Sequence, residues 1–220
     1  MAGLAGAAGP AGGLLAGVLG EARPGVSSQV AAEERPSLGA NSSIAADEQG
    51  RPWVTDEAKR TFRLSGVVWE ALPGENTDIG LGGDTAWGIG AQPSDVGGCS
   101  LYQWDESGRT WHRDPVAYGV RIAVDNGGVP WHINAQNGIY RGIASSVRNV
   151  AGAGRDIGAG GGAVWLIGTN AGAGGFGIWV WDEEGSRWLQ DATGAGTRIA
   201  VDSSGLPWVV NSHGSIFRKG

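Results

Sequence analysis

The chain reads RIAVDNGGVPWHINAQNGIYR over residues 121–141 and returns to nearly the same text, RIAVDSSGLPWVVNSHGSIFR, over residues 198–218. A shorter form, IAADEQGRPWV, begins at Ile44. A second kind of unit alternates with the first: DIGLGGDTAWGIG starts at Asp78 and recurs as DIGAGGGAVWLIG at Asp156. Self-similarity of this kind is the signature of a repeat architecture.

One tryptophan recurs in every unit, and the five are Trp53, Trp87, Trp131, Trp165 and Trp208. They are 34, 44, 34 and 43 residues apart, so a pair of units spans 77 or 78 residues. Each unit is therefore close to the length of a four-stranded propeller blade. A tryptophan fills a wide apolar gap and has one N–H to satisfy. We expect these five side chains to form the structural core between blades.

Strands can be assigned within one unit. Ile122 begins a short apolar segment typical of a buried inner strand, and the Asx- and Gly-rich turn at residues 125–128 follows it. Trp131 marks the second strand, Ile139 the third, and residues 147–150 the fourth. The longer units add a hairpin of outer strands, WDESGRTW over residues 104–111 and WDEEGSRW over residues 181–188. Their acidic residues lie at the turns, where we expect them to be solvated.

The predicted fold is all-β: a tryptophan-rich β-propeller with five recognisable four-stranded blades over residues 44–220. Residues 1–43 are rich in Ala and Gly, hold no Trp, and are expected to form a disordered leader. The last unit ends after its third strand, at Ile216 to Arg218, and residues 27–38 are the nearest candidate for a fourth. We therefore expect an incomplete six-bladed ring in the form of an arc. A strained five-bladed ring and completion by a second chain are the alternatives. Open sheet edges would favour self-association.

Charge and cysteine content exclude several classes of partner. The net charge is −6 and the pI is near 5.0, which argues against nucleic acid and against anionic membrane as partners. Cys99 is the only cysteine, so neither an intrachain disulfide nor a cysteine-rich metal site can form. No apolar run reaches transmembrane length.

Localisation stays open at this level. The N-terminal tract MAGLAGAAGPAGGLLAGVLG has no Lys or Arg before its apolar part, unlike a secretory signal. Together with the lone cysteine this slightly favours the cytoplasm over secretion. Asn41 begins a glycosylation sequon, which has meaning only if the chain is secreted.

The sequence offers no catalytic constellation. The histidines are His112, His132 and His213, and neither an HExxH spacing nor a G-x-S-x-G elbow occurs. The Gly-rich stretches after Asp78 and Asp156 are repeat turns that no helix follows. We therefore predict a protein without enzymatic activity, cofactor or metal.

The residue before each inner-strand isoleucine alternates in sign, as Asp78, Arg121, Asp156 and Arg198. Because inner strands surround the channel of a propeller, these four are expected in one ring. They either pair between neighbouring blades or form a polar ring that meets a ligand. Loops between second and third strands are expected on the same face. They comprise residues 90–100 and 168–177 in the long units and contain Asn134, Asn137, Asn211 and His213 in the short ones. These side chains both donate and accept hydrogen bonds, which suits sugar hydroxyls.

The combination of DIGxG…WxIG with RIAVDxxGxPWxxNxxGxIYR resembles the tectonin repeat of tectonins, tachylectin-1-type lectins and fish-egg lectins, over residues 44–218. The resemblance implies a six-bladed propeller. It also implies binding of glycans, of bacterial lipopolysaccharide or, inside cells, of membrane and autophagy partners. The leading expectation is a lectin-like module with repeated shallow sites for a glycan or glycoconjugate, for example on a microbial surface. The alternative is an intracellular scaffold for protein interaction or membrane trafficking.

Overall fold

A computed structural model of the chain describes residues 35–95 and 97–219. Most of the predicted leader, residues 1–34, lies outside the described residues, and so does the greater part of the candidate closing strand at residues 27–38. Residues 35–42 contain no strand, and the first strand begins at Ser43. Apart from one short 3-10 turn, η1 (Ala144–Ser146), every regular element described is a β-strand. No helix in this part of the chain is long and apolar enough to cross a membrane.

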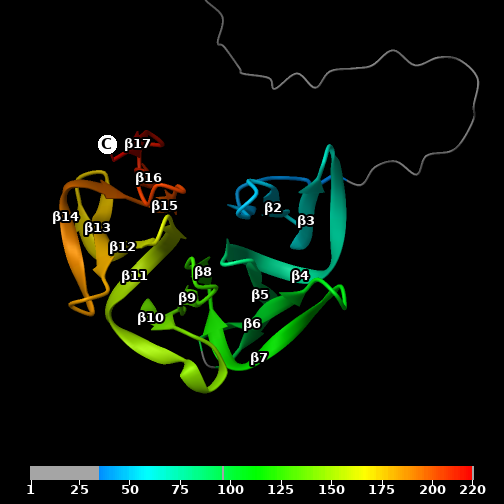
Figure 1. Cartoon of the computed structure of the whole chain (residues 1–220). Coiled ribbons are helices and arrows are strands. Elements are labelled where there is room, and N and C mark those ends of the chain that lie inside the picture. Colours follow the sequence, from blue (N-terminus) through cyan, green and yellow to red (C-terminus); the bar gives the residue numbers. More distant parts are fainter. Residues whose placement is uncertain (1–34, 96, 220) are drawn as a thin grey trace, which may run out of the picture. The chain divides into compact units, whose positions relative to one another are not determined.

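The strands form three antiparallel sheets, and because two of these sheets each run through two blades, the chain has five consecutive blades, which we call blades 1 to 5 (Figure 1). Blade 1 comprises β1 (Ser43–Ala46), β2 (Pro52–Thr55), β3 (Arg60–Ser65) and the first half of β4 (Val68–Gly82); blade 2 comprises the second half of β4, β5 (Thr85–Ser94), β6 (Gly98–Asp105) and β7 (Thr110–Gly119). Blade 3 comprises β8 (Arg121–Val124), β9 (Pro130–Ile133), β10 (Gly138–Arg141) and the first half of β11 (Arg148–Gly160); blade 4 comprises the rest of β11, β12 (Ala163–Gly172), β13 (Gly175–Asp182) and β14 (Arg187–Gly196). Blade 5 has only three strands, β15 (Arg198–Val201), β16 (Pro207–Val210) and β17 (Ile216–Arg218).

Two long strands each belong to two blades. β4 pairs with β3 up to Glu75 and with β5 from Asn76, so the outer strand of blade 1 continues as the inner strand of blade 2. β11 joins blades 3 and 4 in the same way. The segments predicted as loops at residues 90–100 and 168–177 are also largely strand, because β5 extends to Ser94 and β12 to Gly172.

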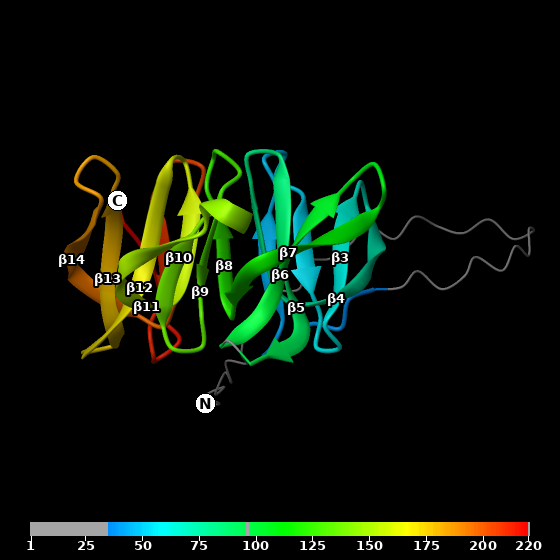
Figure 2. The same cartoon turned by 90° about the horizontal axis from the view of Figure 1, so that it is seen from below.

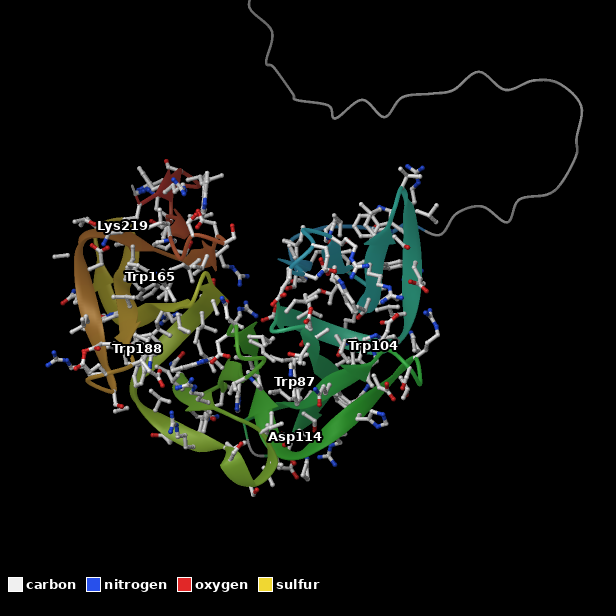
Figure 3. All side chains as sticks on the ribbon, viewed as in Figure 1. Trp87, Trp104, Asp114, Trp165, Trp188 and Lys219 are labelled. Atoms are coloured by element: carbon white, nitrogen blue, oxygen red, sulfur yellow. The ribbon has the colours of Figure 1, made fainter. Side chains whose placement is uncertain are left out.

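Apolar side chains fill the spaces between adjacent blades. Trp131, Ile133 and Ile139 of blade 3 pack against Ile157 and its neighbours in blade 4. Four repeat tryptophans are almost completely buried: Trp53, Trp87, Trp131 and Trp165. Figure 3 labels two of them, Trp87 and Trp165, on the ribbon. Trp208 departs from the prediction that all five form the core. Its side chain is 45 % exposed, because no sheet of the described chain covers the outer face of blade 5.

Strand pairing leaves the ring open in the part of the chain that the structure describes. Within the described residues, no strand of blade 1 pairs with a strand of blade 5. Figure 1 shows the sheets following one another in an arc, and Figure 2 shows their strands running between the two rims. The arc agrees with the expectation from the sequence, and blade 5 has no fourth strand among the described residues.

Candidate functional site: the channel mouth

The predicted charged ring lies around one cavity. Asp78, Arg121, Asp156 and Arg198 all line a space of about 680 Å³ at the end of the inner strands. Each of them precedes an isoleucine of an inner strand, and successive side chains of a strand point to opposite faces. The isoleucines Ile79, Ile122, Ile157 and Ile199 are buried between blades, which leaves the charged neighbours directed toward the channel.

Asp78 ties three blades together. One carboxylate oxygen, Oδ2, accepts the backbone N–H of Ile122 at 3.0 Å. The other, Oδ1, accepts the hydroxyl of Ser43 at 2.5 Å and the N–H of Ile79 at 3.1 Å. Burial raises the pKa of Asp78, and the hydrogen bond from Ser43 opposes that shift. With both oxygens occupied, Asp78 has a structural role at the base of the ring.

Asp156 is less completely satisfied. Its Oδ2 accepts the N–H of Ile199 at 2.9 Å, which repeats the contact between Asp78 and Ile122. Its Oδ1 lies 3.6 Å from Nε of Arg121 and 3.9 Å from a terminal nitrogen of Arg198. Burial raises the pKa of Asp156 to about 6, and the nearby Asp78 carboxylate contributes to the rise. One carboxylate thus faces two guanidinium groups, both beyond normal hydrogen-bond distance.

The two arginines keep unused hydrogen-bonding capacity. Arg121 donates one terminal N–H to the carbonyl of Val120 at 2.8 Å. Its Nε is buried and has no hydrogen-bond partner among the described residues. Arg198 is 54 % exposed at its side chain and extends into the same cavity. A buried N–H without an acceptor costs about 1–3 kcal/mol. An anionic group that enters the cavity would meet that need.

The predicted pairing between neighbouring blades is present around Asp156, which lies within 4 Å of both Arg121 and Arg198, but it is missing between Asp78 and Arg121. No ion pair within 4 Å joins Asp78 to Arg121 in the described part of the chain, and the nearest carboxylate to Arg121 is that of Asp156 in the next blade. The reason is that Asp78 is already held by Ser43 and two backbone N–H groups.

Apolar groups border the charged ring. Ile44 of blade 1 and Trp208 and Ile216 of blade 5 line the same cavity, and all three are exposed. Lys59 contributes a further positive charge to the lining, and Asp56 and Glu57 contribute negative ones. The site therefore combines a charged floor with an apolar side wall.

The four predicted loop residues are not part of this cavity. Asn134 Oδ1 accepts the N–H groups of Gln136 and Gly138 at 3.0 and 2.8 Å, and Asn211 Oδ1 accepts those of His213 and Ser215, both at 2.9 Å. Asn137 adopts a left-handed φ of 65°. These asparagines therefore shape their own turns, as Asx residues commonly do. Asn211 also lines a smaller cavity of about 380 Å³ beside Asp191 and Lys219.

The histidines form no cluster. His132 is buried with Nδ1 2.9 Å from the carbonyl oxygen of Tyr118, and burial lowers its pKa. His112 is exposed, 3.4 Å from Asp105. Among the residues that the structure describes, no group of three or more His, Cys, Asp or Glu could hold a metal ion.

Sequence reasoning missed an ion pair that joins neighbouring blades. Glu106 and Glu183, expected to be solvated turn residues, each accept two hydrogen bonds from an arginine of the preceding blade. The partners are Arg63 and Arg141. The sequence did contain a signal for this ion pair: an Arg follows the third strand of the first kind of unit, and a Trp-Asp-Glu triplet recurs in the second kind.

The fold is that of a β-propeller. A solved structure described as "YCF48 bound to D1 peptide" is similar to this chain, with a TM-score of 0.53 over 83% of this chain and 67% of that chain. The two sequences are 15% identical, so the likeness concerns the fold alone. No family model matches the chain, and no curated protein matches it.

Proposed function

We propose that this chain is a non-enzymatic protein-interaction propeller that binds a peptide segment of a partner at the channel mouth. Arg121 and Arg198 hold a carboxylate of that peptide, from its C-terminus or from an acidic side chain. The observation that supports this most is the Nε of Arg121, which is buried and has no hydrogen-bond partner among the described residues, in a cavity that the Arg198 guanidinium also lines. A carboxylate is the natural acceptor for such a pair.

The remainder of the cavity suits a peptide. Its volume of about 680 Å³ is in the range of ligand pockets. The exposed side chains of Ile44, Trp208 and Ile216 offer apolar contacts beside the charged floor. The similar propeller structure also holds a peptide, which supports a protein partner over a glycan for this chain.

Binding of short synthetic peptides to the full chain tests the proposal. We expect acidic peptides with a free C-terminus to bind, and neutral peptides with an amidated C-terminus to bind weakly. Arg121→Gln and Arg198→Gln should each weaken binding about tenfold or more. A hydrogen bond involving charged groups contributes about 1.5–3 kcal/mol, and about 1.4 kcal/mol corresponds to a factor of ten.

Arg187→Gln is the matched control. Arg187 pairs with Asp182 in the β13–β14 hairpin and does not line the channel cavity. Its removal should leave peptide affinity unchanged, while circular dichroism and thermal unfolding verify that each variant is folded. Equal peptide affinity in all three variants would refute binding at the channel mouth.

The resemblance to tectonin repeats favours a second candidate, a lectin of that family. The observation behind it is the alternation of the two motifs over residues 44–218. A glycan array probed with the same purified chain distinguishes the two functions. Glycan binding that survives both arginine substitutions, without binding to acidic peptides, would favour the lectin.

A further inference from the structure

Two junctions in the arc are built by the same ionic contact. Arg63 of blade 1 donates to both carboxylate oxygens of Glu106 in blade 2, at 2.6 and 2.9 Å. Arg141 of blade 3 donates to both oxygens of Glu183 in blade 4, at 2.8 and 2.9 Å. Each glutamate also accepts an indole N–H from the tryptophan two residues before it, Trp104 or Trp181. The Trp-Asp-Glu hairpin therefore holds the arginine of the preceding blade.

The apolar part of the junction between blades 3 and 4 is equally specific. Four side chains of blade 3 form its face: Ala123, Trp131, Ile133 and Ile139. They pack against three side chains on the inner strands of blade 4: Ile157, Val164 and Leu166. Trp181 and Trp188 of the hairpin complete the cluster, with ring centroids 5.2 and 5.9 Å from that of Trp131.

Blade 5 presents the same face at the same register. Its counterparts are Ala200, Trp208, Val210 and Ile216, which pair across β15, β16 and β17 as their equivalents do in blade 3. Here the face is open. Trp208 is 45 % exposed where Trp131 is 0 % exposed, and Ile216 is 66 % exposed where Ile139 is 0 % exposed.

Arg218 on this face takes the position that Arg141 has in blade 3. The Arg218 guanidinium lies over the Trp208 ring at 5.6 Å, as that of Arg141 lies over Trp131 at 4.8 Å. Nε and one terminal nitrogen of Arg218 bind Asp202, the counterpart of Asp125. What Arg141 has in addition is Glu183, and the described residues place no glutamate against Arg218.

We infer that the outer face of blade 5 is a docking surface for a β-sheet of a partner protein that carries a Trp-Asp-Glu hairpin, with its glutamate paired to Arg218. A docked sheet would cover Trp208 and Ile216, which also line the channel cavity, so a sheet on blade 5 and a peptide against that wall exclude each other. Charge complementarity requires an acidic hairpin, and the exposed Trp208 and Ile216 require an apolar inner strand opposite them.

The other occupants fit this face less well. Residues 1–34 contain no tryptophan, so their sequence has no Trp-Asp-Glu triplet. A second copy of this chain has two faces of the required kind, on blades 2 and 4. Both are already buried against blades 1 and 3, through Ile79 and Trp104 in one case and Ile157 and Leu166 in the other.

The test adds such a sheet to the chain itself, as a second copy of blade 4. Residues 142–196 are fused to the full chain behind Arg218, in place of Lys219 and Gly220. Hydroxyl-radical footprinting read by mass spectrometry then follows each side chain separately. In the unmodified chain Trp208 and Ile216 should react readily. In the fusion both should become as unreactive as Trp131 and Ile139 in the same molecule, which serve as internal references.

Two further fusions make the test specific. The same fusion with Trp181→Ala and Glu183→Gln in the added copy should lose the protection of Trp208. A fusion of residues 65–119, which contain the other Trp-Asp-Glu hairpin, should protect Trp208 as well.

Reactive Trp208 in both intact fusions overturns the inference, whether or not the added copies fold. In the chain itself these segments form blades 2 and 4, where they fold against the same kind of side chains in blades 1 and 3. A dimer of the unmodified chain that protects Trp208 would also overturn it, because the occupant would then be a second copy.

Discussion

Trp131 and Trp208 hold the same place in the repeat, yet one is fully buried and the other is half exposed. Trp131→Ala should lower the free energy of unfolding by about 3–5 kcal/mol, the usual cost of removing a large core side chain. Trp208→Ala should cost clearly less, about 1–2 kcal/mol, since much of its ring already faces water. Urea unfolding of both variants measures the difference. Equal losses would mean that Trp208 is covered in solution.

Asp156 makes peptide binding depend on pH. Its pKa is raised to about 6 by burial, so the carboxylate becomes neutral as the pH falls below that value. The protonated group no longer competes for the guanidinium groups of Arg121 and Arg198. An acidic peptide, whose own carboxylates titrate near pH 4, should therefore bind more tightly at pH 5.5 than at pH 7.5 by roughly a factor of several.

Asp156→Asn is the matched variant for that prediction. It should bind the peptide at pH 7.5 as tightly as the unaltered chain does at low pH, and its affinity should vary little between the two. The same residue affects folding in a known direction. Because its pKa is higher in the folded chain, its contribution to stability is largest below about pH 4 and is lost as the pH rises through about 6. A titration that shows weaker peptide binding at pH 5.5 would contradict this account.

The repeat predicted the role of a residue only where that role depends on the residue's position within a single strand. The alternation of Asp and Arg before the inner-strand isoleucines placed four charges in one ring. The partner of each charge could not be predicted, because it depends on how the inner strands approach one another across the channel. Ser43, for example, occupies the ring position of blade 1 and binds Asp78.

Among the elements, the turns between inner strands fix how closely the blades approach. Gly161, between β11 and β12, has a φ of 53°, and a Cβ there would lie 2.1 Å from the backbone nitrogen of Gly205 in blade 5. Gly66, between β3 and β4, has a φ of 63° with nothing within 4 Å. Gly161→Ala should therefore destabilise the chain by about 1–3 kcal/mol more than Gly66→Ala does.

Thermal or denaturant unfolding of the two glycine variants measures this prediction. Both positions carry the same left-handed backbone strain, so their difference isolates the contact between blades. Identical losses would show that blade 5 is not packed against blade 4 as described.

The hairpin of blade 4 should be coupled to blade 3 through Arg141 and Glu183. A double-mutant cycle with Arg141→Gln and Glu183→Gln should give a coupling of about 0.5–1 kcal/mol, as for a partly exposed ion pair in which one guanidinium nitrogen donates to both carboxylate oxygens. The cycle of Arg187→Gln with Asp182→Asn, a pair within one hairpin, is the control and should not alter the packing of blade 3. Zero coupling between Arg141 and Glu183 would remove the ionic part of the junction.

Strands were predictable from the sequence, but their continuity was not. The apolar pattern located β8, β9 and β10 because short buried strands alternate with Gly- and Asx-rich turns. It did not reveal that β4 and β11 each pass from one blade into the next. Periodicity indicates which side chains are buried, and it says nothing about the sheet to which the neighbouring residue belongs.

At the scale of the whole molecule, the order of blades accounts for the open face. The first and second kinds of unit alternate, and blade 5 is of the first kind, so its outer face is built for a unit of the second kind. Neither residues 35–95 nor residues 97–219 supply one. The surface that is buried in blade 3 is therefore open in blade 5, where it carries Trp208, Ile216 and Arg218.

Hydrogen exchange of the unmodified chain, read peptide by peptide, tests the open arc most directly. The inner strands of blades 2, 3 and 4 are covered on both faces, so we predict slow exchange in β5, β9 and β12. The strands β15, β16 and β17 have one open face and should exchange much faster, and β17 should be the fastest because it is the outer edge strand and all of its residues are exposed. Exchange in β16 and β17 as slow as in β9 and β10 would contradict an open arc and would show that blade 5 is covered.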